Sequence, residues 1–378
     1  MNMFLVCSMI LFKQNEIKVD NPTEPISILI ASFNEESSIY DTIKSVIEQD
    51  YKGKITIYAI DNNSTDKTKE EIYRAITDFV GYDIRYVFEK KKGKSNALNT
   101  ALKQVDTKYT ITLDADTMLH SGALRLLVGR IVSSEDDVVA VAGAILVNNA
   151  NDNIISKLQV WDYLLSITSV KKMQSMFNST LVAQGAFSIY RTDKLNEING
   201  WDDTIGEDIV LTWKLLRKGY SVLYEPTAMS YTNVPVKLKH LFRQRKRWAR
   251  GLIEGLRFAM PWKFKSTYCK LMTLIDIAII YVDFSYCFFW IPAVILAIFF
   301  KWYGIVGIMT LLVLPLTFIS FFILYIKEKH HALNELGIKP SKNFFSLLFF
   351  LITYQSIMST SALCGYIEEV FGLKKVWK

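Results

Sequence analysis

The stretch Ile26–Phe33 (ISILIASF) is an almost unbroken apolar run, and Asn34 follows it directly. Such a run is typical of a strand that is buried on both faces of a parallel sheet. Three further β-rich runs alternate with three helical patterns after it: Ile55–Ile60, Ile84–Phe88 and Tyr109–Leu113 as strands, and 37–49, 67–79 and 96–104 as helices. This βαβ alternation predicts an α/β fold with a doubly wound sheet and right-handed crossovers.

Acidic and amide side chains follow three of the predicted strands, where doubly wound sheets bind their ligands. They are Asn34 and Glu36 after the first strand, Asp61 at the end of the second, and Asp114 and Asp116 after the fourth. The Asp114-Ala115-Asp116 pair offers the oxygen ligands with which Mg²⁺ or Mn²⁺ bridges to substrate phosphates. Two other interpretations remain open: a solvated Asp-x-Asp loop, and an Asx-turn over 61–66 that caps the next helix.

Two motifs further along the chain also combine a structural and a chemical interpretation. Glu207-Asp208 precedes an amphipathic helix, where a carboxylate either stabilises the helix start or acts as a general base toward an acceptor hydroxyl. Gln244–Trp248 lies in a basic helical stretch ahead of a long apolar segment. That stretch suits a membrane surface, but tryptophan beside arginine can also hold a sugar ring and a diphosphate.

The composition limits the classes of protein to which the chain can belong. Its 378 residues are 51% apolar and 21% charged, with a net charge of +7, which excludes a disordered chain and allows two to three domain-sized units. The four cysteines and four histidines show neither CxxC nor HExxH spacing, so a zinc site is not expected. Gly93-Lys94-Ser95 lacks the first glycine of a phosphate-binding P-loop, because Phe88 occupies that position.

The apolar residues concentrate after Met272, in three stretches of about the length that spans a bilayer. These are Ile275–Phe300, Trp302–Tyr325 and Phe344–Tyr366, and we interpret them as transmembrane helices rather than buried core helices. Lysine and arginine are enriched before the first stretch and in the loop 327–342, which predicts a cytoplasmic location for both. The segment Met1–Phe12 is too short to span and is expected to be an interfacial anchor or a reduced helix.

These patterns predict four regions. They are a short apolar segment at 1–22, a nucleotide-sugar domain at 23–235, basic interface helices at 236–271 and a membrane domain at 272–378 with about three transmembrane helices.

The motifs in their order along the chain resemble the processive family 2 glycosyltransferases, which include cellulose, chitin and hyaluronan synthases. The motifs are Phe33–Glu36, Asp61–Asp66, Gly93-Lys94, Asp114-Ala115-Asp116, Gly206-Glu207-Asp208 and Gln244–Trp248. The stretch from Tyr224 to Gly251 is most similar to that of the bacterial poly-β-1,6-N-acetylglucosamine synthases. The resemblance covers roughly residues 25 to 260, and the linked set is far more specific than any single motif.

The resemblance implies a GT-A (Rossmann-like) nucleotide-sugar domain, followed by an amphipathic interface helix and C-terminal transmembrane helices. It assigns Asn34, Glu36, Asp61, Lys94, Asp114 and Asp116 to the UDP-sugar, with Asp61 at the uracil and Asp114 and Asp116 also holding Mg²⁺ or Mn²⁺. It makes Asp208 the catalytic base. It assigns Glu207, Gln244, Arg247 and Trp248 to the acceptor and the diphosphate.

Three departures from the family pattern stand out. Ala31 replaces a common proline, Gly206 replaces the usual threonine before Glu-Asp, and Asn62-Asn63 replaces Asp-Gly. The last departure leaves open which side chain meets the nucleobase. Three predicted spans are few for a translocation channel, so a small membrane partner subunit or self-association is expected.

The resulting expectation is an inverting, multi-pass enzyme of the cell membrane whose catalytic domain is cytoplasmic. It would transfer a sugar, N-acetylglucosamine or a near relative, from a UDP-sugar to a growing β-linked polysaccharide. A non-processive enzyme that acts on a lipid-linked acceptor is the alternative within the class. A transport or scaffold component that only binds nucleotide or anionic lipid is the alternative outside it, and no nucleic-acid partner is expected.

Overall fold

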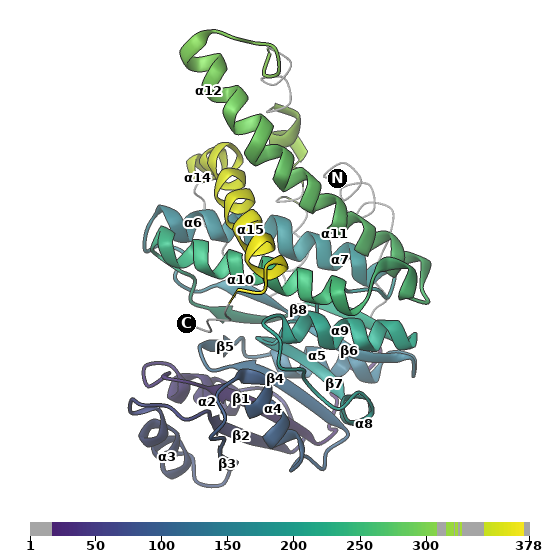
Figure 1. Cartoon of the computed structure of the whole chain (residues 1–378). Helices are drawn as coiled ribbons and strands as arrows, with labels where there is room; N and C mark the ends of the chain where they lie inside the picture. The colour runs from purple at the N-terminus through teal and green to yellow at the C-terminus, as the bar shows by residue number, and fades with distance from the viewer. Residues whose placement is uncertain (1–16, 308–314, 321, 324–325, 327–343, 374–378) are drawn as a thin grey trace.

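The computed structural model describes residues 17–307, 315–320, 322–323, 326 and 344–373 (Figure 1). Its centre is an eight-stranded sheet with strand order β3-β2-β1-β4-β7-β6-β8-β5. The strands are β1 Ile26–Ser32, β2 Ile55–Asp61, β3 Asp83–Phe88, β4 Tyr109–Asp114, β5 Thr117–Leu119, β6 Val138–Val147, β7 Phe187–Arg191 and β8 Ser221–Thr232.

Helices cover both faces of this sheet. Those of the first half are α2 Ile39–Ile47, α3 Thr68–Asp78, α4 Lys94–Leu102 and α5 Ala123–Val132. Those that follow are α6 Ile154–Trp161, the π-helical segment η1 Asp162–Thr168, α7 Ser169–Met176, α8 Thr192–Glu197, α9 Glu207–Lys218 and α10 Leu238–Phe258.

The N-terminal half of the sheet confirms the predicted βαβ alternation. Strand β1 pairs in parallel with both β2 and β4, so that Ile28 lies opposite Ile57 on one side and Ile111 on the other. Ile28 and Ile30 enter the core beneath α2, α3 and α5, whereas Leu29 enters the core on the face of α4. The apolar run decides the fold because a strand covered on both faces needs apolar side chains at every position.

The second half of the sheet, for which the sequence pattern predicts no strand directions, is mixed. Strand β7 runs antiparallel to both β4 and β6, whereas β8 is parallel to β6. Because β7 runs antiparallel to β4, its first residues lie at the carboxyl end of β4, where the Asp114 N–H donates to the Ala186 carbonyl oxygen at 3.1 Å. The loop that contains Ala186, 72 residues after Asp114, thereby reaches the edge where ligands are expected.

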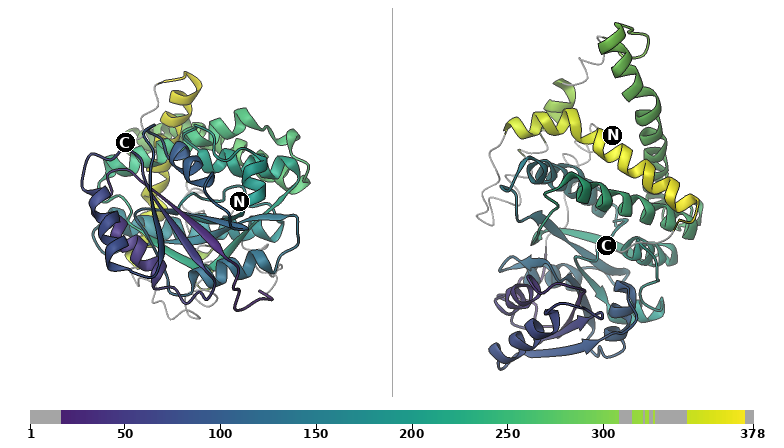
Figure 2. Two further views of the ribbon diagram at one scale, coloured as in Figure 1. Left: turned by 90° about the horizontal axis from the view of Figure 1, so that it is seen from below. Right: turned by 60° about the vertical axis from the view of Figure 1, so that its left-hand side comes forward.

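Helix α10 lies between the sheet and the apolar C-terminal helices (Figures 1 and 2). It packs against α9 on one side and against α15, Gln355–Val370, on the other. The contact with α15 is close at Gly365, where an added Cβ would lie 2.5 Å from the Lys246 carbonyl oxygen. A larger residue at 365 would therefore push the two helices apart.

Two helical stretches have the length and composition to cross a membrane in the described part of the chain. The first, Thr267–Phe300, joins α11 Thr267–Ser285, η3 Tyr286–Trp290 and α12 Ile291–Phe300, and it projects away from the sheet in Figure 1. The second, Phe345–Val370, joins α14 Phe344–Phe349, η5 Phe350–Tyr354 and α15. Only 17% and 28% of their most apolar windows are buried, which is low for core helices.

These two stretches correspond to the first and third predicted spans. Part of the second predicted span, 302–325, lies outside the described residues, namely 308–314, 321 and 324–325, as do the segment 1–12, the loop 327–342 and the basic tail from 374. The short helical turn Pro261–Lys263 (η2) precedes the first stretch.

Candidate active site

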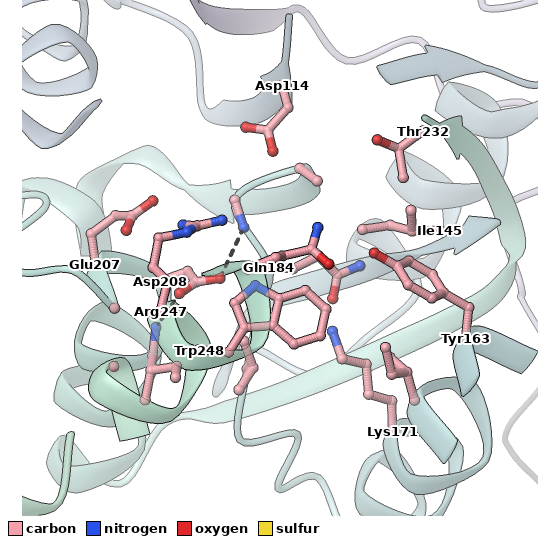
Figure 3. A pocket seen from close by; sticks show the side chains of 18 of the residues that line it. Asp114, Ile145, Tyr163, Lys171, Gln184, Glu207, Asp208, Thr232, Arg247 and Trp248 are labelled. Atoms are coloured by element: carbon pink, nitrogen blue, oxygen red, sulfur yellow. Dashed lines mark hydrogen bonds between the residues drawn. The ribbon is translucent and has the colours of Figure 1, made fainter. Parts of the chain in front are cut away.

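Two adjoining cavities open at the carboxyl ends of the parallel strands. One, of about 320 Å³, is lined by residues that follow β1, β2 and β4. The other, of about 380 Å³, lies between the loop before β7, α9, α10 and α7. They share five charged side chains: Lys94, Asp114, Asp116, Glu207 and Arg247. We refer to the first as the strand-end cavity and to the second as the helix-side cavity, part of which is drawn in Figure 3.

Three residues expected at the nucleotide form hydrogen bonds that hold together the loops beside the strand-end cavity. Asp61 is buried, and its carboxylate accepts from the Ser64 N–H at 2.9 Å and from the Tyr86 hydroxyl at 3.1 Å. The Asn34 amide oxygen accepts from the Thr65 N–H at 2.8 Å. The Thr65 contact joins the loops after β1 and β2, and the Tyr86 contact joins β2 to β3, so these strand ends are fixed relative to one another.

Glu36 also joins the loops after β1 and β2, because its carboxylate accepts from the Lys67 N–H at 2.9 Å. Asn34, Glu36 and Asp61 are absent from the residues that line either cavity among those described, whereas Asn62 lines the strand-end cavity. The Asn62 amide oxygen accepts from the Gly93 N–H at 2.7 Å. Gly93 has φ +130°, a conformation that L side chains rarely adopt, and it delivers Lys94 at the start of α4.

Lys94 connects the carboxylates on the two sides of the shared wall. Its Nζ donates to Asp114 and lies 3.7 Å from the Glu207 carboxylate. Burial lowers the pKa of Lys94, but the charges of Asp114, Glu207 and Asp208 outweigh it and the net direction is upward. Lys94 is therefore a fixed positive charge between Asp114 and Glu207.

Asp114 and Asp116 are brought together as the sequence predicts. Burial and then the neighbouring charges of Asp114 and Glu35 raise the pKa of Asp116 to about 6. Two neighbouring carboxylates repel each other when both are ionised, and a bound cation would offset this repulsion. No cluster of three or more His, Cys, Asp or Glu ligands occurs among the described residues. Two carboxylates plus substrate phosphates nevertheless form a usual ligand set for Mg²⁺, so the pair fits a divalent ion.

Asp208 faces only the helix-side cavity, whereas Glu207 lines both. Asp208 lies in the first turn of α9, where its carboxylate accepts from the Ile209 N–H at 2.8 Å and, weakly, from the Gly185 N–H at 3.4 Å. Burial raises the pKa of Glu207 to about 7, with Lys94 opposing the shift and Asp208 adding to it. These two adjacent carboxylates thus differ in environment, and Asp208 is the one that faces the larger cavity without a cation paired to it among the described side chains.

The structure gives a reason for glycine at position 206. A Cβ there would lie 2.6 Å from the Gly251 Cα, so α9 and α10 touch through two glycines. The Gly206 N–H donates to the buried Glu254 carboxylate at 2.9 Å. Threonine at this position would require the two helices to separate.

Helix α10 brings Gln244, Arg247 and Trp248 to the helix-side cavity together. The guanidinium of Arg245, which is 2% exposed, lies 4.0 Å from the centre of the Trp248 ring and pairs with Asp162 at 2.8 Å. Arg245 therefore fixes the Trp248 indole through a cation–π contact.

Two other basic residues of α10 pair with carboxylates of α15. Lys246 pairs with Glu368 at 2.7 Å, and Arg250 pairs with Glu369 at 3.0 Å. Lys246 and Arg250 therefore hold α10 against α15. Their carboxylate partners lie more than 100 residues away in the sequence, where no local pattern could indicate them.

Three residues that sequence reasoning missed also line the helix-side cavity: Tyr163, Lys171 and Gln184. Figure 3 shows their side chains directed into it, with the Lys171 amine on the side of Gln184 and Trp248. They come from η1, α7 and the loop before β7, and no local motif marks them. The one sequence signal for Lys171 was the pair of lysines at 171 and 172, in a helix whose other residues are uncharged.

The comparisons with known proteins cover the part of the chain that forms this site. The family model described as "Glycosyltransferase like family 2" matches residues 22–251. A poly-beta-1,6-N-acetyl-D-glucosamine synthase of Staphylococcus aureus is 34% identical over 242 residues, which is 63% of this chain and 57% of that protein. The Staphylococcus epidermidis protein of the same description is 35% identical over 231 residues, covering 60% and 54%.

The match therefore spans little more than half the length of these curated relatives. Among solved structures, a mannosyltransferase from Pyrobaculum calidifontis in complex with GDP-Man and Mn²⁺ superimposes with a TM-score of 0.66. The alignment covers 98% of this chain and 95% of that chain at 16% sequence identity. This similarity shows a GT-A-like fold of Rossmann type.

Proposed function

Because the chain belongs to the glycosyltransferase like family 2, we propose that it transfers N-acetylglucosamine from UDP-N-acetylglucosamine to a growing β-linked polysaccharide. The donor sugar and the product are taken from the staphylococcal relatives, which are 34 to 35% identical to this chain. The fold neighbour and the family match support the reaction class, and the site geometry supports the roles of the residues.

The observation that carries the proposal is the pair of cavities with one shared wall of charged side chains. A UDP-sugar in the strand-end cavity would put its diphosphate beside Lys94, Arg247 and the Asp114–Asp116 pair. Its sugar would then face the helix-side cavity, where Asp208 and the Trp248 ring lie. Two substrates can thus approach each other from opposite sides of the wall, as a transfer reaction requires.

In the proposed mechanism Asp208 is the general base. Its carboxylate takes the proton of the acceptor hydroxyl while that oxygen attacks the anomeric carbon, the bond from that carbon to the UDP oxygen breaks, and the configuration inverts. Lys94 and Arg247 would stabilise the charge that develops on the departing diphosphate. Trp248, supported by Arg245, would hold the acceptor ring.

Asp114 and Asp116 would hold a Mg²⁺ or Mn²⁺ ion together with the substrate phosphates. The ion would supply further neutralisation of the leaving diphosphate. Asn34, Glu36 and Asp61 would contribute to nucleotide binding by fixing the two loops, and Asn62 would be the side chain of this group closest to the nucleotide.

We also propose that the protein is a multi-pass protein of the cell membrane with its catalytic domain on the cytoplasmic side. The exposed apolar stretches Thr267–Phe300 and Phe345–Val370 support membrane insertion. We place the domain boundaries after residues 22, 235 and 271, as the sequence predicts. A small membrane partner subunit or a second copy of the chain would cover part of the exposed apolar surface.

The test is Asp208→Asn, which preserves shape but removes the base. We expect transfer to fall about 10² to 10⁴-fold, with UDP affinity unchanged. Asp193→Asn, in α8 and away from both cavities, is the matched control and should keep wild-type turnover. Full activity of the Asp208 variant would refute the role of this residue.

A second measurement tests the substrate and the alternative. Membranes that contain the protein are incubated with Mn²⁺ and separately labelled UDP-sugars, and the products are sized. Label from UDP-N-acetylglucosamine in a large, lipid-free product supports the proposal. A single sugar attached to a lipid would instead establish the non-processive alternative.

A further inference from the structure

Lys171 is a cation inside the helix-side cavity that the mechanism above does not use. It lies on α7, and its amine points into the cavity in Figure 3. No hydrogen bond or ion pair joins its Nζ to another residue within the part of the chain that the structure describes. Burial lowers the pKa of Lys171 to about 7, and the charge of Asp208 opposes the shift. An amine placed in this way costs stability, because no described residue compensates it.

The same cavity contains amide oxygens that lack donors. Gln184 is 9% exposed, and its amide nitrogen donates to the Gly143 carbonyl oxygen. That bond fixes the orientation of the amide and leaves its Oε1 buried without a donor among the described residues. The Gln244 Oε1 is likewise buried without a donor among the described residues. Buried acceptors of this kind are normally satisfied, so each one indicates a missing donor.

The missing partners have complementary chemistry. An ammonium group only donates hydrogen bonds and an amide oxygen only accepts them. A ligand that satisfies both must therefore carry acceptors and donors on one small framework, and it must fit beside the aromatic rings of Trp248 and Tyr163. A sugar ring with hydroxyl and acetamido groups has this combination, because an acetamido group presents a carbonyl oxygen next to an N–H.

We propose that Lys171 and Gln184 form a binding subsite for the terminal sugar of the acceptor and make it selective for an uncharged, N-acetylated sugar. Lys171 donates to an oxygen of that sugar and Gln184 accepts from one of its N–H or O–H groups. The subsite rests on the proposed transferase function. It orients the sugar whose hydroxyl Asp208 deprotonates.

Selectivity follows from the charge on Lys171. A terminal sugar with a free amine would bring a second cation to the same cavity, and like charges at close range are unfavourable. In slightly acidic buffer both amines are protonated, so the discrimination is strongest there. The other charged groups that line this cavity are Lys94, Asp114, Asp116, Glu207, Asp208 and Arg247, and they remain in every variant tested.

The experiment uses the full chain in detergent or nanodiscs with UDP-N-acetylglucosamine, Mn²⁺ and β-1,6-linked oligosaccharide acceptors. Lys171→Met keeps the length of the side chain but removes the amine. We expect its KM for the N-acetylated acceptor to rise about tenfold or more, with the KM for the UDP-sugar within about twofold of wild type. Lys171→Arg keeps the cation and should restore part of the affinity. Lys172→Met, the neighbouring lysine that does not line the cavity, is the control.

A second arm compares N-acetylated acceptors with the same oligomers bearing free amines. The wild type should prefer the N-acetylated form, and Lys171→Met should lose most of that preference. Wild-type acceptor KM and preference in Lys171→Met would overturn the subsite while leaving the transferase function intact. Absence of any transfer by the wild-type protein would instead overturn the transferase function and the subsite with it.

Discussion

The contact between α10 and α15 allows a prediction that links the apolar C-terminal helices to the active site. Glu369 is 5% exposed and accepts from the Arg250 Nε at 3.0 Å and from the Arg257 Nη1 at 2.9 Å. Arg250 is equally buried and lies on the helix that carries Arg247 and Trp248. Glu369→Gln removes the charge that compensates Arg250 without changing the shape of the side chain.

The cost can be estimated from the remaining contacts. Removing one partner of a buried ion pair costs about 3 to 5 kcal/mol. Arg250 keeps a bond to the Leu373 carbonyl oxygen at 2.8 Å and a longer one to Glu368 at 3.5 Å, so we expect about 2 to 3 kcal/mol. The Arg257 side chain is 52% exposed and adds less than about 0.5 kcal/mol.

The matched control is Glu368→Gln, one residue earlier on the same helix. Glu368 is more exposed and pairs mainly with Lys246, so its loss should cost about 0.5 kcal/mol. In thermal unfolding of the detergent-solubilised protein, the Glu369 variant should lower the Tm by roughly 4 °C and the Glu368 variant by roughly 1 °C. The acceptor KM should rise only in the Glu369 variant, because α10 loses its anchor. Equal effects of the two variants would refute the reasoning.

Three further outcomes are expected. Gly206→Thr should lose most activity and about 1 to 3 kcal/mol of stability, because its Cβ would overlap Gly251. UDP release measures the activity and denaturant unfolding the stability, and wild-type values in both would contradict the close contact. Chelation by EDTA should stop transfer, and Mn²⁺ should restore it, with activity that persists in EDTA counting against the carboxylate pair. Because burial raises the pKa of Glu207 to about 7 from an ordinary value near 4.5, its carboxyl contributes stability below that ordinary value and loses it as the pH rises toward 7. Glu207→Gln should therefore flatten the fall in denaturant midpoint between about pH 5 and 7, and a parallel pH dependence of the two proteins would contradict this origin.

Much of the site was predictable because it depends on the ends of local elements. An apolar run predicts a buried strand, and the residue after that strand lies at the end of the sheet regardless of how the rest of the chain folds. Asp114 and Asp116 are adjacent for this reason, and Glu207 and Asp208 begin α9 for a similar one. The roles expected for Asn34, Glu36 and Asp61 were less predictable, since a side chain at a strand end can face a ligand or brace a loop.

The sequence by itself determined the parallel half of the sheet, the two long apolar helices in the described part of the chain and the order of the polar motifs. Each of these follows from periodicity or composition within some ten to twenty residues. Only the tertiary structure decided that β7 runs antiparallel to β4, which brings Gln184 to the cavity beside Asp208, and that α7 places Lys171 in the same cavity. It also decided that Arg250 pairs with Glu369, 119 residues away. Such contacts depend on strand order and helix packing, and these are set by the burial of whole faces rather than by any local pattern.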